Sequence, residues 1–138
     1  MKLHPHLSLL TLALAALLTT SARAADYEPK VGLQTWTCRG MKFDEMVAFA
    51  EKHQLKYIQA IGSHIDPNGA PEESKRKKAI LEEKGLTCYT FGVAGTSADK
   101  EKNRKLFEFA KLMGIKVIVV EPKNDAATWD SLEELVKE

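Results

Sequence analysis

Short apolar runs alternate four times with stretches of helical apolar spacing between Val31 and Glu138. The runs begin near residues 31, 56, 86 and 115, and apolar residues then recur every three or four positions. A strand–helix rhythm of this period predicts a parallel sheet with helices packed on one face. Four such units are half of an eightfold barrel, so we expect an α/β fold, a parallel (βα)4 half of a TIM (βα)8 barrel.

The boundaries of these elements follow from local signals. Strands are expected over residues 31–36, 57–61, 87–93 and 115–120, and the last is apolar enough to be covered on both faces. Pro71 is placed as the first residue of the second helix. Gly85 and Gly114 are placed as left-handed ends of the second and third helices. Asp130 and Glu133 form a D-x-x-E signal that predicts the start of the fourth helix.

The first 24 residues have a different character from the repeat. Lys2 precedes an apolar run from Leu7 to Leu18, and Ala22-Arg23-Ala24 fits a cleavage site. This pattern predicts a secretory signal peptide over residues 1–24, followed by a linker (25–30) and the barrel segment (31–138). The run is shorter than the ~20 residues of a membrane span. The protein is therefore expected to be periplasmic or secreted, with no membrane attachment after cleavage.

The carboxyl end carries no helix stop signal, and a four-stranded sheet has two open edges. We therefore expect the chain to be the truncated amino-terminal half of a barrel. A natural half-barrel that closes by dimerisation and a small open α/β domain are the alternatives. The open edges also predict self-association.

Charge and cysteine content narrow the class of protein. After residue 24 the chain has 18 basic and 19 acidic residues, which gives no reason to expect a nucleic-acid partner or an anionic membrane. Cys38 follows the first strand and Cys88 lies in the third, so one strand should separate them by about 10 Å. A disulfide spans no more than about 7 Å between Cα atoms, so free thiols are expected.

Polar and aromatic residues cluster where the predicted strands end, which is where the sites of βα barrels lie. Rings that stack on sugar faces and amides that bond hydroxyls suit a carbohydrate ligand. The candidate substrate-binding residues are Gln34, Trp36, Gln59, His64, Tyr89 and Lys123. The alternative for Trp36 is a lid on the barrel mouth. Arg39, Asp66, Phe91 and Gly92 also belong to these strand ends.

Glu121 and His64 are the candidates for chemistry. Glu121 follows four apolar residues and precedes Pro122, so its carboxylate can take a proton or bind a divalent metal, unless it forms a rim salt bridge. His64 lies two residues from Asp66, a pair that can bind metal or move a proton. The alternative for His64 is a solvated or turn-bonded loop residue.

Several segments together resemble the sugar phosphate isomerase/epimerase family, with its xylose-isomerase-like TIM barrel, and especially its exported bacterial members. They are Val31-Gly-Leu-Gln-Thr-Trp36, Phe43-Asp-Glu-Met46, Tyr89-Thr-Phe-Gly-Val93 and Val119-Val-Glu-Pro122. The resemblance covers about the first half of a family domain. It implies isomerisation or epimerisation of a carbohydrate, with a divalent metal (Mn, Mg or Zn) assisting proton transfer between adjacent carbons.

Carried over residue by residue, the resemblance places Glu121 as a catalytic residue and metal ligand, with His64 nearby. The main metal ligands are expected in later strands, so the chain alone should bind no metal and be weak or inert as an isomerase. Two other functions stay open at this point. One is a non-catalytic periplasmic sugar-binding or half-barrel interaction module, and the other is an AP-endonuclease-like metal hydrolase, which the charge balance disfavours.

Overall fold

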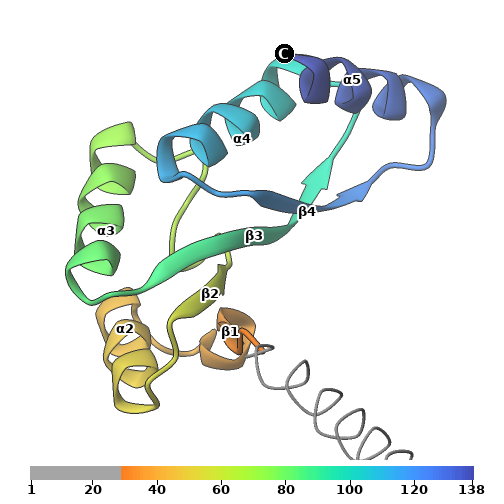
Figure 1. Ribbon diagram of the computed structural model, residues 1–138. Coiled ribbons are helices and arrows are strands. Elements are labelled where there is room, and N and C mark those ends of the chain that lie inside the picture. The colour runs from red at the N-terminus through yellow and green to blue at the C-terminus, as the bar shows by residue number, and fades with distance from the viewer. Residues whose placement is uncertain (1–28) are drawn as a thin grey trace, which may run out of the picture. The chain divides into compact units, whose positions relative to one another are not determined.

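A computed structural model of the chain describes residues 29–138, and residues 31–138 form one compact unit. The predicted signal peptide and most of the linker lie outside the described residues. Four strands alternate with helices in this unit (Figure 1). The strands are β1 (Gly32–Gln34), β2 (Tyr57–Ala60), β3 (Thr87–Thr96) and β4 (Val117–Pro122). The helices are η2 (Thr35–Cys38), α2 (Phe43–Lys52), α3 (Pro71–Glu83), α4 (Lys100–Met113) and α5 (Ala126–Lys137).

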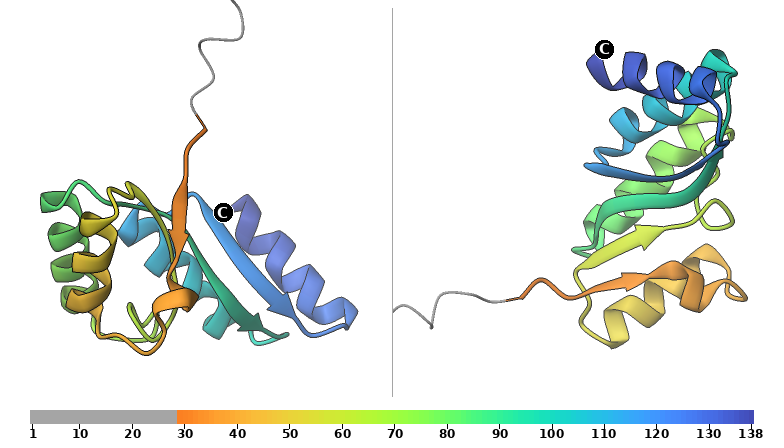
Figure 2. Two further views of the ribbon diagram at one scale, coloured as in Figure 1. Left: turned by 90° about the horizontal axis from the view of Figure 1, so that it is seen from below. Right: turned by 90° about the vertical axis from the view of Figure 1, so that its right-hand side faces the viewer.

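The strands form one parallel sheet in the order β1-β2-β3-β4, which confirms the predicted (βα)4 arrangement (Figure 2). Strand neighbours in sequence are neighbours in space, as in half of a βα barrel. None of the helices in residues 29–138 is long and apolar enough to cross a membrane.

The core lies between the sheet and its helices. One set of alternate strand residues points into it, and the buried sides of α2, α3 and α4 complete it. The strand members are Leu33, Ile58, Ala60, Cys88 and Phe91, with Ala94, Ile118 and Val120 packed against them. Phe91 belongs to this core, where its ring meets Phe109 edge-on at 4.9 Å, and not to the ligand face as the sequence suggested.

Three helices end in the same way, and this explains the repeat in the sequence. The amide of Leu55 donates to Ala50 O at 3.0 Å, that of Leu86 to Leu81 O at 2.8 Å, and that of Ile115 to Ala110 O at 2.9 Å. These are Schellman motifs, in which a left-handed residue ends the helix and an apolar residue follows. Gly85 and Gly114 take the predicted left-handed conformation, with φ of 67° and 74°.

Gln54 takes the same role without being glycine, at φ 55°. A side chain in this region carries a conformational cost that glycine avoids. We expect Gln54→Gly to raise the free energy of unfolding by about 0.5–1 kcal/mol. Urea denaturation measures this change, and Gly85→Gln is the reciprocal control, with a loss of about the same size expected. A loss of stability in Gln54→Gly would show that the glutamine side chain contributes more than its backbone costs.

Several element boundaries and the cover of one strand differ from the sequence prediction. Strand β3 runs on to Thr96, because it pairs with β4 as far as Pro122. Helix α5 begins at Ala126, where Asp125 accepts the Thr128 amide at 2.8 Å, and the expected start at Asp130 is wrong. Strand β4 is not covered on both faces, because its alternate residue Val117 is 44% exposed.

Both cysteines are buried free thiols. Burial raises the pKa of the Cys88 thiol to about 11, because a thiolate is poorly solvated inside the core. Cys88 therefore packs as a small apolar group and has little thiolate at neutral pH.

Candidate functional site

The face of the sheet opposite the helices is open, and it carries most of the candidate residues. Gln34 and Gln59 alternate with core residues on β1 and β2, and the two are register partners. Tyr89 is 48% exposed and Val93 is 61% exposed on β3. In a closed barrel this face is the interior, and the ligand site lies at the carboxyl ends of its strands.

A shallow pocket of about 450 Å³ lies where β1 and β2 end on this face. Its lining comes from the end of β1, the start of η2, the turn after β2 and the bulge in β3. The lining residues are Gln34, Trp36, Ile61, Gly62, Ser63, Gly92 and Val93. None of these side chains is charged, so the pocket offers amide, hydroxyl and aromatic groups to a ligand.

Gln59 connects the pocket to β3. Its Nε2 donates to the carbonyl oxygen of Gly92 at 3.4 Å, and its backbone is the partner of both Gln34 and Thr90. The bulge at Gly92 and Val93 shifts the β3–β4 register and turns the Gly92 carbonyl toward Gln59. Gln34 and Gln59 therefore belong to the same face of the sheet on neighbouring strands, and strand pairing fixes their backbones next to the pocket.

Trp36 forms an exposed wall of the pocket. Its side chain is 58% exposed, and the Arg39 guanidinium lies 5.3 Å from the centre of its ring. Arg39 Nη1 also donates to the Trp36 carbonyl oxygen at 3.1 Å. The buried Thr35 fixes this turn, because its Oγ1 accepts the Ile61 amide at 3.2 Å. The indole is thus held by a cation–π contact and by its backbone while it stays accessible.

His64 has a different environment from the one expected of a ligand-binding residue. It is 1% exposed, and its Nε2 lies 3.2 Å from the carbonyl oxygens of both Cys38 and Met41. Since carbonyl oxygens only accept, Nε2 carries the hydrogen. Lys77 Nζ donates to the His64 carbonyl oxygen at 2.8 Å. His64 therefore ties the loop after β2 to the β1–α2 connection. It is not solvated, and its amide is bonded within the turn, to Ile61 O at 3.0 Å.

The remaining candidates lie outside the pocket lining. Glu121 is on the open face of β4, where its register partner is Gly95, two residues beyond the Val93 that lines the pocket. Two strand residues span about 7 Å, so Glu121 lies near the pocket without being one of its lining residues. Lys123 follows β4, is exposed, and its amide donates to Thr96 O at 3.2 Å. Tyr89 lies on the open face of β3, on the amino-terminal side of the pocket residues Gly92 and Val93.

The metal site implied by the family resemblance takes its main ligands from later strands, with Glu121 as a further ligand. Within residues 29–138 no three His, Cys, Asp or Glu side chains lie close enough to hold one ion. Glu121 forms no ion pair with another described residue, so the rim salt bridge is also not formed.

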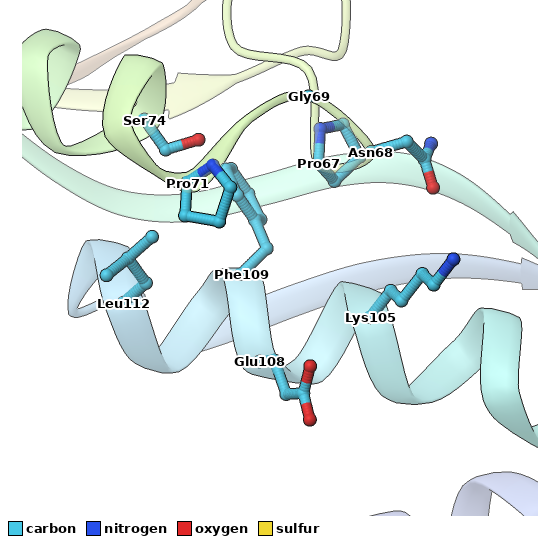
Figure 3. Close-up of a pocket in the computed structure, with 9 residues that line it drawn as sticks. All are labelled: Pro67, Asn68, Gly69, Pro71, Ser74, Lys105, Glu108, Phe109 and Leu112. Carbon is cyan, nitrogen blue, oxygen red and sulfur yellow. The ribbon is translucent and has the colours of Figure 1, made fainter.

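A second groove of about 440 Å³ lies in the helix layer (Figure 3). Its lining comes from the loop after β2, the start of α3 and one side of α4, including Lys105, Glu108 and Phe109. The groove in Figure 3 is outside the sheet face where barrel sites gather, and it shares no residue with the pocket near Trp36.

Sequence reasoning missed four lining residues of the pocket: Ile61, Gly62, Ser63 and Val93. Ser63 follows the second strand within two residues of its predicted end, so its position at a strand exit was the available signal. The position of Val93 in the pocket was not predictable, because the hydrophobic pattern does not indicate the bulge in β3 that exposes this residue.

Comparisons with known proteins support the architecture. No family model and no curated protein matches the chain. A crystal structure of an uncharacterized protein from Parabacteroides distasonis ATCC 8503 matches with a TM-score of 0.69 and 24% sequence identity over 78% of this chain. The chain spans 48% of the length of that protein. A likeness at this identity shows the fold.

Proposed function

We propose that residues 31–138 form the carbohydrate-binding half of an exported sugar isomerase or epimerase barrel. The observation that carries the proposal is the pocket at the strand ends, where the exposed Trp36 indole stands beside Gln34 and Ser63. An apolar wall with a few fixed polar groups is the usual composition of a small-molecule site. The export part of the proposal rests on residues 1–24 alone.

The chemistry of the lining favours a neutral sugar. The indole offers a flat apolar face to the C–H side of a pyranose or an open-chain sugar, and the amide and hydroxyl groups bond its oxygens. No Lys or Arg side chain is among the lining residues, and the nearby Arg39 guanidinium contacts the Trp36 ring and donates to the Trp36 carbonyl oxygen. Sugars without phosphate are therefore the preferred ligands, and Glu121 is the carboxylate on the open face that stays available for proton transfer in a closed barrel.

Fluorescence of Trp36 tests this function. The chain has two tryptophans, so Trp129→Phe leaves Trp36 as the single indole. We expect a saturable change in its emission as aldoses or ketoses are added, and a weaker response to their phosphates. In a chain that keeps Trp129, Trp36→Ala should raise the dissociation constant for sugar, measured by calorimetry, about tenfold, which corresponds to about 1.4 kcal/mol of binding free energy.

The matched control is Trp36→Phe, which leaves Trp129 as the reporter. Its emission should not respond to sugar, because Trp129 is on α5 and does not line the pocket. A response from Trp129 with none from Trp36 would contradict the proposed site.

A non-catalytic sugar-binding module is a second candidate, favoured by the absence of a titratable side chain in the pocket lining. The two functions differ in what happens to a bound aldose in deuterated water. An isomerase that transfers a proton exchanges the hydrogen on the carbon next to the carbonyl, whereas a binding module leaves it in place. Proton NMR of the sugar measures the difference.

A further inference from the structure

An asparagine–glycine pair, Asn68-Gly69, lies in the turn that connects β2 to α3 (Figure 3). Asp66 holds this turn through two hydrogen bonds. The Gly69 amide donates to Asp66 O at 3.1 Å, and the Asn68 amide donates to Asp66 Oδ1 at 2.9 Å. Asn68 and Gly69 are both exposed, and the bond from Asn68 to Asp66 is made by its backbone and not by its side chain.

This pair has the composition that favours attack of a backbone nitrogen on an asparagine side chain. The nitrogen of the following residue closes a five-membered ring when it bonds to the asparagine Cγ, and a side chain on that following residue hinders the approach. Gly69 has no side chain, and glycine reaches unusual backbone conformations more readily than other residues. Since the pair is exposed, water has access to it.

We propose that Asn68 is the residue at which this chain deamidates. The Gly69 nitrogen loses its proton to hydroxide from the solvent and bonds to Asn68 Cγ. The bond from Cγ to the side-chain nitrogen breaks, and that nitrogen takes a proton from water and leaves as ammonia. Water then adds to either carbonyl carbon of the resulting succinimide and opens the ring. The product is aspartate or isoaspartate at position 68.

The reaction changes the groove in the helix layer, because Asn68 is one of its lining residues. A neutral amide becomes a carboxylate, which adds negative charge to a groove that Lys105 and Glu108 also line (Figure 3). The isoaspartate product also lengthens the backbone by one carbon before Gly69. The groove shares no residue with the pocket near Trp36, so this inference does not rest on the carbohydrate function.

The turn controls the rate in the folded chain. The hydrogen bond from Gly69 to Asp66 O holds the proton that must leave before the nitrogen can attack, so the turn has to open first. Asp66→Ala removes the carboxylate that accepts the Asn68 amide, and this exposed hydrogen bond is worth about a threefold change in how often the turn opens. We therefore expect the folded variant to deamidate about threefold faster than the parent chain. In urea, where the turn is lost, the two should react at the same rate.

Asn124 is the matched control within the same chain. It is exposed like Asn68, and the amide of the residue that follows it, Asp125, also donates to a nearby carbonyl oxygen, that of Lys123, at 2.9 Å. The residue after Asn124 carries a side chain, whereas the residue after Asn68 does not. Comparing the two asparagines therefore isolates the effect of the glycine.

Mass spectrometry of tryptic peptides measures both rates after incubation of the full chain at mildly alkaline pH. Trypsin places the two asparagines in separate peptides, residues 57–75 and 124–137. Deamidation adds one mass unit, and fragmentation of the peptide backbone separates aspartate from isoaspartate. We expect the peptide of residues 57–75 to gain this mass at least about tenfold faster than the other, because only its asparagine precedes a glycine.

Gly69→Ala tests the attack by the backbone nitrogen. It should slow deamidation of Asn68 about tenfold, in the folded chain and in urea alike. The added Cβ would lie 3.3 Å from Asp66 O, and circular dichroism checks that the fold is kept. Equal rates at Asn68 and Asn124, or an unchanged rate in Gly69→Ala, overturn the proposal. Equal rates of the folded parent and Asp66→Ala overturn the control of the reaction by the turn.

Discussion

Gly92→Ala is expected to lower the free energy of unfolding by about 3 kcal/mol. Gly92 has φ of 135°, a region that side chains rarely adopt. A Cβ at this position would overlap the carbonyl oxygen of Val119 and lie 3.0 Å from the Val119 carbonyl carbon and Cβ. Strands β3 and β4 would have to separate where the bulge brings them together, so the β3 side of the pocket would change as well.

Gly95→Ala is the control for this prediction, because Gly95 lies in the same strand with no neighbouring atom within 4 Å of an added Cβ. Its effect should stay within about 0.5 kcal/mol. Guanidinium denaturation of both variants gives the comparison. Equal effects of the two substitutions would show that the close approach of Gly92 to Val119 is not formed in solution.

His64→Ala is expected to cost about 2–4 kcal/mol of stability. The substitution removes a fully buried ring and its hydrogen bonds to the carbonyl oxygens of Cys38 and Met41, of which Cys38 O keeps the Met41 amide at 2.8 Å. Both effects loosen the connection between β1 and α2, and this connection contains Trp36 and Arg39. Thermal and urea unfolding followed by circular dichroism measure the loss.

The control is Asn68→Ala, an exposed residue of the same loop, which should cost less than about 0.5 kcal/mol. A substrate-binding role for His64 predicts the reverse of the structural role. In that case His64→Gln would weaken sugar binding and leave the unfolding midpoint unchanged.

The regular part of the fold was predictable because each strand and helix carries its own local signal. Gly85, Gly114 and Pro71 set helix ends through backbone geometry that depends on few distant contacts, and the structure places them as predicted. The start of α5 was wrongly placed at Asp130, because Asp125 is equally suited to cap a helix. Asp125 follows β4 more closely, and it is the residue that caps α5.

Long-range packing explains the failures. The apolar pattern of β4 does not reveal that one of its faces lies open, since coverage depends on elements from elsewhere. His64 looked like a surface loop residue because the two carbonyl oxygens that hold it lie 23 and 26 residues earlier. Phe91 and Tyr89 were assigned to one face, but a register shift between β2 and β3 sends Phe91 into the core.

The candidate site was predicted in part. Gln34 and Trp36 line the pocket and Gln59 lies beside it, as their positions at strand ends suggested. Glu121 and Lys123 are also at a strand end, but β3 and β4 extend further than β1 and β2, so these residues lie just beyond the pocket lining. Relative strand length is set by pairing, so a single sequence does not show it.

Chemical-shift mapping with a neutral aldose tests the carbohydrate site most directly. Amide spectra of the ¹⁵N-labelled chain should change for residues 34–36, 61–63 and 92–93, and Trp36→Ala should abolish these changes at the same sugar concentration. Shifts confined to residues 67–74 and 105–112, the groove of Figure 3, would contradict the account, as would a spectrum that sugar leaves unchanged.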